Sequence, residues 1–142
     1  MIVVDANILL YAYDSTSAMH GKARSWVEQI FAGNELTALP WQTISAFVRI
    51  VTNPRLPGER FTAGEAVQVV EDWLAQPNVR AIGPGERHWS SFRQMLIDGQ
   101  ASGPLTTDAA LAALTIEHGG VLYTTDRDFA RFPGLRWMNP LA

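Results

Sequence analysis

Short apolar runs alternate with stretches of helical periodicity along the whole chain, and this alternation limits the possible folds more than any other feature. Apolar runs that predict strands are Ile2–Val4, Leu36–Leu39, Val79–Ile82 and Val121–Tyr123, with Leu135–Met138 as a further strand at an edge. Strands that alternate with helices pair in parallel, because each return crossing is made by a helix. We therefore expect an α/β fold, a three-layer α/β/α sandwich around a parallel sheet of four to five strands.

The segments between these runs have helical spacing. Predicted helices are a short one through Ile8–Tyr11, then Lys22–Phe31, Trp41–Val51, Ala63–Leu74, about Glu86–Ile97 and Asp108–Glu117. Thr62 is followed three residues later by Glu65, a capping-box pattern that marks the start of one of these helices. The stretch Thr52–Phe61, with its prolines and glycine, predicts a loop.

Length and composition favour one compact domain, residues 1–142, with 47% hydrophobic residues. The absence of cysteine excludes disulfides, thiol catalysis and cysteine-type zinc sites. Apolar stretches fall far short of the ~20 residues of a membrane span, so we expect no membrane association and a cytoplasmic location. A net charge of −3 argues against a broad nucleic-acid surface but allows a local basic rim.

Aspartates stand where predicted strands end or a predicted helix begins. Asp5 closes the first strand, Asp108 opens an alanine-rich helix, and Asp126 and Asp128 follow the fourth strand. The carboxyl ends of parallel strands line one crevice, where ligands bind. Carboxylates gathered there repel one another unless a divalent cation neutralises them. The pattern predicts a metal site.

Adjacent strands lie about 4.8 Å apart, so Asp5 and Asp126 can bridge one Mg²⁺ while Asp108 joins from a helix N-terminus. A water acidified by the cation is then a candidate nucleophile toward phosphorus. Asn7 is placed to orient a ligand or to fix the turn. Alternatives stay open: Asp108 as an ordinary acid at a helix start, and Asp128 as the cap of a short turn.

Other polar and aromatic residues offer no second site. Glu117 lies nine residues after Asp108 in the same predicted helix, so we expect it to be solvated at the surface. The histidines, His20, His88 and His118, lack the spacing of a zinc site. The five tryptophans are interpreted as core or dimer surface rather than as stacking platforms.

Together these segments resemble a known family. The motifs that carry the resemblance are Val4–Asn7, Arg49–Arg55, Thr107–Leu114 and Tyr123–Phe129. In this order and spacing they resemble the PIN-domain toxins and, more narrowly, the VapC ribonuclease toxins of bacterial type II toxin–antitoxin pairs. Leu39-Pro40-Trp41 and Phe129–Leu135 resemble a mycobacterial-type subgroup.

The resemblance implies an endoribonuclease that depends on Mg²⁺ or Mn²⁺ and cleaves structured RNA such as tRNA or rRNA. It also implies a homodimer and a neutralising VapB-type antitoxin. Carried over by position, Asp5 and Asp108 are metal ligands, Asp126 completes the catalytic set, and Asp128 is a further candidate ligand.

Candidate RNA contacts come from the same motifs. Arg49 and Arg55 are candidates for contacting phosphate, and Arg55 lies in a loop, where functional groups are common. The alternative for Arg49 is a salt bridge on the helix surface. Arg127 either reaches RNA or offsets the neighbouring acids. Asn7 and Thr125 are the remaining candidate RNA contacts.

One departure from the family pattern concerns the helix Trp41–Val51, where Ala46 stands at a position that many members fill with glutamate. This departure motivates an alternative: a PIN-like binding module of weak or no activity, bound by a small antitoxin partner. Phosphoryl-transfer proteins of other classes fit less well. A haloacid-dehalogenase-type phosphatase needs an aspartate where Asn7 stands, and a receiver domain needs a late lysine, whereas Lys22 comes early.

Overall fold

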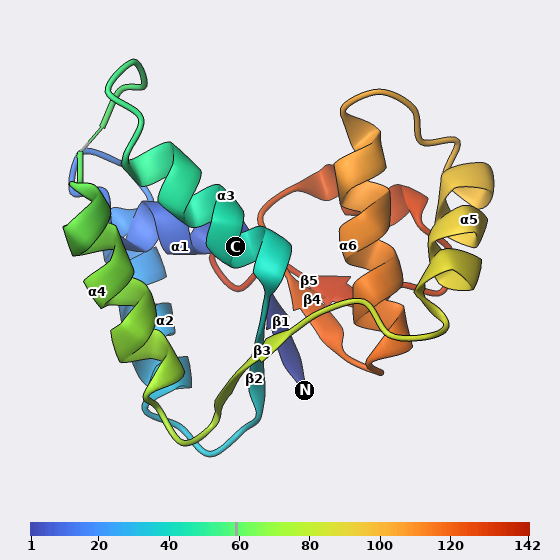
Figure 1. Ribbon diagram of the computed structural model, residues 1–142, viewed down its shortest axis with the longest axis horizontal. Coiled ribbons are helices and arrows are strands. Elements are labelled where there is room, and N and C mark those ends of the chain that lie inside the picture. Colours follow the sequence, from blue (N-terminus) through green and yellow to red (C-terminus); the bar gives the residue numbers. More distant parts are fainter. Residues whose placement is uncertain (59) are drawn as a thin grey trace.

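The computed structural model describes residues 1–58 and 60–142. Its centre is a five-stranded parallel sheet with strand order β3-β2-β1-β4-β5 (Figure 1). The strands are β1 (Ile2–Val4), β2 (Thr37–Pro40), β3 (Val79–Ile82), β4 (Val121–Tyr123) and β5 (Trp137–Met138). The predicted parallel α/β fold is confirmed, including the edge position of the last strand.

Helices cover both faces of this sheet. They are α1 (Ala6–Ala12), α2 (His20–Phe31), α3 (Trp41–Val51), α4 (Ala63–Leu74), α5 (His88–Asp98) and α6 (Leu105–Glu117), with a 3₁₀ helix η1 (Arg127–Arg131). Figure 1 shows α1 to α4 gathered on one side of the sheet and α5 with α6 on the other. Among the described residues, no helix combines the length and apolarity needed to cross a bilayer.

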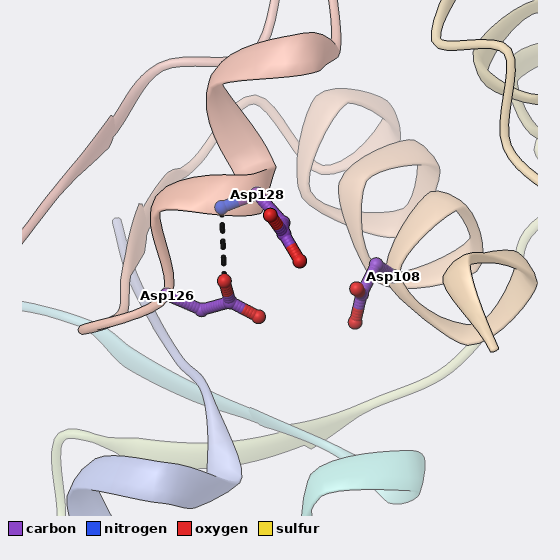
Figure 2. Close-up of side chains that lie close together, drawn as sticks. All are labelled: Asp108, Asp126 and Asp128. Atoms are coloured by element: carbon purple, nitrogen blue, oxygen red, sulfur yellow. Dashed lines mark hydrogen bonds between the residues drawn. The ribbon is translucent and has the colours of Figure 1, made fainter.

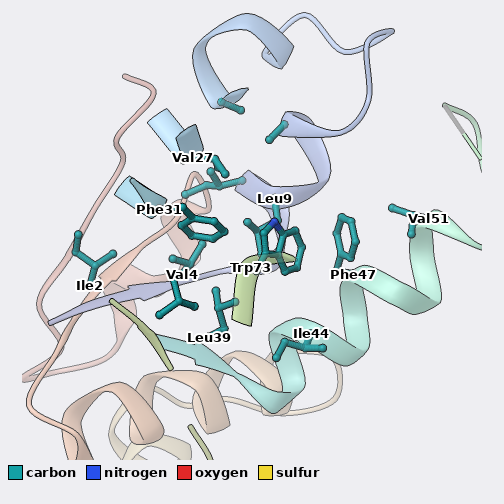
Figure 3. Packing of buried hydrophobic residues seen from close by; sticks show 14 of the residues in the cluster. Ile2, Val4, Leu9, Val27, Phe31, Leu39, Ile44, Phe47, Val51 and Trp73 are labelled. Carbon is teal, nitrogen blue, oxygen red and sulfur yellow. The ribbon is translucent and has the colours of Figure 1, made fainter. Parts of the chain in front are cut away.

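Alternation along β1 divides the core into two layers. Ile2 and Val4 pack into the cluster under α1 to α4, whereas Val3 packs into the cluster under α6. Figure 3 shows the first cluster, where Trp73 lies against Phe47 with ring centroids 4.6 Å apart. This double burial explains why the strands read as continuous apolar runs.

Most predicted boundaries agree with the structure within two residues. The bounds of α3, α4 and β3 are those expected, and Thr62 and Glu65 form the capping box at the start of α4, with hydrogen bonds of 2.9 and 3.1 Å. The predicted loop Thr52–Phe61 contains residue 59, which lies outside the described residues.

The start of α6 differs from the prediction. The helix begins at Leu105, three residues before Asp108, and Asp108 lies within its first turn. Pro104 precedes it with φ −58°, a value compatible with a helix start, and Leu105 and Thr106 donate to the carbonyls of Ser102 and Gly103. Asp108 therefore points from the side of the first turn instead of opening the helix.

Candidate active site

Asp5 joins the end of β1 to the neighbouring strand β4. Its backbone N–H donates to the carbonyl of Tyr123 at 3.1 Å, and its Oδ1 accepts from the backbone N–H of Ala6 at 2.8 Å, which caps α1. Its other oxygen, Oδ2, accepts from the Thr124 hydroxyl at 2.7 Å. Burial raises the pKa of Asp5, the hydrogen bonds from Thr124 and Ala6 oppose the rise, and the charge of Asp126 adds to it.

Thr124, the first residue after β4, connects three site residues. Its fully buried hydroxyl donates to Asp5, accepts from the backbone N–H of Asp126 at 3.0 Å, and accepts from Asn7 Nδ2 at 3.4 Å. One donated and two accepted bonds use the full capacity of a hydroxyl. Thr125, the neighbouring residue predicted for the site, is only partly buried, whereas Thr124 was not predicted. The available signal was a polar residue directly following a buried strand.

Asn7 has an unused acceptor. Its Oδ1 is buried and has no hydrogen-bond partner within residues 1–58 and 60–142. Since buried polar atoms are almost always paired, this oxygen is free to face a ligand or a water. Both roles considered for Asn7 remain compatible with this geometry: its amide braces the turn through Thr124, and its oxygen is available.

Three aspartates form a compact cluster. Asp108, Asp126 and Asp128 each offer one carboxylate oxygen, and these oxygens all lie within 4.8 Å of one another. Figure 2 shows Asp108 approaching from α6, Asp128 from η1 and Asp126 from the position just before η1, with all three carboxylates facing a common space. Asp126 caps η1 by accepting from the backbone N–H of Asp128 at 2.9 Å.

Burial and neighbouring charges together raise the pKa of Asp108. Desolvation, followed by the charges of Asp126, Asp5 and Asp128, raises the pKa of Asp108 to about 6, and Arg131 acts in the opposite direction. The donor set consists entirely of oxygen, which suits Mg²⁺ and Mn²⁺. These residues therefore fit a divalent cation that would relieve their repulsion.

The PIN-domain model matches residues 2–135, nearly the whole chain. The chain belongs to the PIN-domain family. Within this family it is 39% identical to Ribonuclease VapC43 of Mycobacterium tuberculosis over 141 residues, covering 99% of this chain and 96% of that protein. It is 37% identical to Ribonuclease VapC37 of the same organism over 142 residues, covering 100% and 99%. These relatives place it among the VapC ribonuclease toxins.

Solved structures of PIN-domain proteins share the fold at lower identity. VapC20 of Mycobacterium tuberculosis, described as a toxin that cleaves the sarcin–ricin loop, matches with a TM-score of 0.68 and 18% identity, covering 96% of this chain and 99% of that one. A toxin–antitoxin complex from Klebsiella pneumoniae matches with a TM-score of 0.65 and 18% identity, covering 99% and 98%.

The aspartates that lie closest together in the structure are not the same three that the sequence predicted as the centre of the site. The prediction centred on Asp5, Asp108 and Asp126, with Asp128 as an additional ligand. In the structure Asp128 is part of the compact cluster, whereas Asp5 lies beside it, held by Thr124 and acting on Asp108 through its charge. All four carboxylates share the carboxyl edge of the sheet.

No carboxylate reaches this cluster from α3. Ala46 is partly buried, and α3 contains no acidic residue. One turn earlier, Gln42 Nε2 donates to the carbonyl of Thr107 at 3.3 Å. Gln42 therefore ties the start of α3 to the residue directly before Asp108, which positions α6 without adding a charge.

The candidate arginines are not gathered at this edge, because Arg49 lies in the last turn of α3, at the end of the helix away from β2. Arg127 is exposed on η1 between Asp126 and Asp128, while Arg49 and Arg55 are exposed on α3 and in the following loop. The described residues contain no salt bridge to Arg49, so the alternative of a helix-surface ion pair finds no support there.

Glu117 is not solvated as predicted. Its side chain is only 10% exposed, and its carboxylate accepts from the backbone N–H groups of Gly85 at 2.9 Å and Arg87 at 3.0 Å. The prediction was wrong because the turn before α5 folds back onto the end of α6, a contact between residues 30 or more apart in sequence. Glu117 is a structural acceptor at the opposite end of α6 from Asp108.

Proposed function

We propose that this chain is a metal-dependent endoribonuclease toxin that hydrolyses phosphodiester bonds of structured RNA such as tRNA or rRNA. The observation that carries the proposal is the convergence of Asp108, Asp126 and Asp128, with oxygens within 4.8 Å of one another. The names of the VapC relatives and the RNA-cleaving activity in the description of VapC20 support the substrate class.

The three clustered carboxylates are the residues that would hold Mg²⁺ or Mn²⁺, with Asp5 and the free Asn7 Oδ1 beside them. When bound, the cation supplies electrostatic stabilisation at phosphate and makes water a nucleophile near neutral pH. Mg²⁺ keeps several of its waters, so a few carboxylates suffice to bind it.

The remaining residues organise this centre. The Thr124 hydroxyl fixes Asp5 and the backbone of Asp126 relative to each other. The Asp128 amide engages Asp126 Oδ1, which leaves the second oxygen of Asp126 to face the cluster. Arg127 is placed to contact the phosphates of a bound strand, because guanidinium groups pair well with phosphate oxygens.

We also propose a VapB-type antitoxin as partner and a homodimeric toxin. The shared fold with the Klebsiella toxin–antitoxin complex supports the antitoxin. Co-purification of a small peptide with a basic tail, expressed from the same operon, tests this partner. Sedimentation of the isolated protein tests the dimer, which a monomer at micromolar concentration would contradict.

The activity is tested by RNA cleavage with purified protein. We expect cleavage with Mg²⁺ or Mn²⁺, loss of cleavage with a chelator, and strongly reduced cleavage by Asp5→Asn and Asp108→Asn. Equal cleavage by wild type and Asp5→Asn would identify a contaminating nuclease and would overturn the proposal.

A second candidate, a binding module without activity, is favoured by one observation: α3 supplies no carboxylate to the cluster. Calorimetric titration separates the two. Binding of Mg²⁺ or Mn²⁺ at millimolar concentration or below supports the enzyme, whereas no heat of binding in that range supports the inactive module.

A further inference from the structure

Trp41 stands apart from the core residues of its helix. It is the first residue of α3 and directly follows β2, so it lies at the carboxyl edge of the sheet, where the aspartates gather. The residue is 55% exposed. Of the two interpretations of the tryptophans, core or dimer surface, the first does not hold for Trp41: a large flat apolar group is exposed close to the candidate active site.

A glycine fixes the position of this indole. Gly83 follows β3, the strand that pairs with β2, and a Cβ built on Gly83 would lie 3.3 Å from Trp41 Cδ1. The absence of a side chain at Gly83 lets one edge of the indole rest against the backbone. One edge of the ring therefore rests against Gly83, while more than half of the residue remains exposed to solvent.

Few residues separate Trp41 from the acidic cluster. Gln42, the next residue, donates to the carbonyl of Thr107, and Thr107 precedes Asp108. The ends of β2 and β4 are separated by β1 alone and lie about 10 Å apart, and the indole rests toward Gly83 at the end of β3, one further strand spacing from β4. An unpaired base near a phosphate held by the aspartates can reach the indole across this distance.

The surroundings of Trp41 are polar. One turn along α3 lies the exposed Ser45, and the neighbouring Thr107 is also exposed. Among the described residues, no other large apolar side chain on α3 is exposed. On α5, the exposed Trp89 packs edge-on against the ring of Phe92. Protein interfaces are built around a contiguous apolar centre, whereas a single exposed aromatic ring suffices to stack one base of a single strand.

We propose that Trp41 stacks on an unpaired base of the RNA substrate adjacent to the cleaved phosphate. This inference rests on the proposed ribonuclease function and adds a subsite to it. Proteins that contact RNA bases mostly target single-stranded loops, whose unstacked bases splay onto aromatic side chains, and such stacking tolerates any base. Stacking on Trp41 would thus select loop nucleotides, because paired bases cannot reach the indole face.

The test compares Trp41→Ala and Trp41→Phe with Trp89→Ala, a matched control at the other strongly exposed tryptophan. Each protein is assayed on an RNA hairpin and on bis(p-nitrophenyl) phosphate with Mn²⁺, a phosphodiester without a base. We expect Trp41→Ala to raise KM for RNA by about 5- to 150-fold, the loss of one stacked base. Hydrolysis of the small diester should stay within about twofold of wild type, Trp41→Phe should retain most RNA affinity, and Trp89→Ala should change neither activity.

A double-mutant cycle identifies the stacked base. Abasic nucleotides are introduced one at a time beside the mapped cleavage site. At one position the abasic RNA should bind wild type as weakly as intact RNA binds Trp41→Ala, and combining both changes should weaken binding no further.

Unchanged RNA affinity of Trp41→Ala, additive losses at every position, or a dimer-to-monomer change caused by Trp41→Ala alone would each overturn the stacking role. Failure of the proposed function gives a different result. In that case wild type itself cleaves neither substrate with Mn²⁺, while RNA binding by the same variants still tests the platform.

Discussion

The hydroxyl of Thr124 donates a 2.7 Å hydrogen bond to the carboxylate of Asp5, joining residues 119 positions apart in the sequence. The same oxygen accepts from the backbone N–H of Asp126. One buried hydroxyl therefore sets the relative position of acids that follow β1 and β4. Such a connection makes Thr124 a positioning residue for the candidate metal centre.

Replacing Thr124 by valine keeps the shape and removes the hydroxyl. Because the buried Asp5 carboxylate then loses a donor, we expect the free energy of unfolding to fall by about 1–3 kcal/mol and RNA cleavage to fall with it. Thr124→Ser restores the donor and should recover most activity. Urea denaturation and cleavage rates measure both effects. Thr125→Val serves as the neighbouring control for stability alone, because Thr125 is itself a candidate RNA contact, and an equal loss of unfolding free energy there would contradict the special position of Thr124.

Asp108→Asn removes one charge from a crowded cluster. In the absence of metal we expect this variant to melt higher than wild type at pH 7, because the repulsion by Asp126, Asp5 and Asp128 disappears. Wild type should gain stability with Mn²⁺, about 2.7 kcal/mol at 100 times Kd, and the variant should lose this gain. Thermal melts with chelator or Mn²⁺ provide the measurement, with Asp72→Asn on α4 as a control of equal charge. A variant that melts lower and keeps its metal response would refute the site.

The pH dependence of stability follows from the same carboxyl group. The pKa of Asp108 is about 6 in the folded protein, against 3.8 for the ordinary value, so the folded state binds more protons than the unfolded chain between these limits. The free energy of unfolding of the metal-free protein should therefore fall as pH rises from 3.8 to about 6, relative to Asp108→Asn. Burial raises the pKa of Asp5, which acts with the same sign. Urea titrations of both proteins across this range, with chelator present, check the slope; parallel curves would contradict it.

The sequence was sufficient for the parts of the site that depend on strand order. Alternating strands and helices predicted parallel pairing, and parallel pairing put Asp5 and the residues after β4 at the same edge of the sheet. The motifs in addition indicated the PIN-domain family. The prediction of these strands and helices succeeded because hydrophobic periodicity and turn residues are local properties, which the neighbouring residues determine.

Side-chain direction and long-range contacts could not be predicted in this way. Thr124 directly follows β4, which marks it as a candidate, but only the packed structure shows that its hydroxyl and not that of Thr125 donates to Asp5. The alanine-rich run that follows Asp108 predicts a helix start at this residue, yet α6 begins three residues earlier, at Leu105. Glu117 gained backbone partners from a turn that is 30 or more residues distant.

Glu117 provides a last prediction that separates stability from metal binding. Its carboxylate accepts from the amides of Gly85 and Arg87, and its side chain is only 10% exposed. Glu117→Ala leaves both amides without this acceptor, so we expect the free energy of unfolding to fall by about 1–3 kcal/mol, with Glu117→Gln in between. Asp108 lies nine residues earlier in α6, about 13 Å along the axis, so the Kd for Mn²⁺ should not change. Calorimetric titration of Mn²⁺ into folded Glu117→Ala tests this independence, and a severalfold weaker Kd would show that the turn before α5 also positions the acidic cluster through α6.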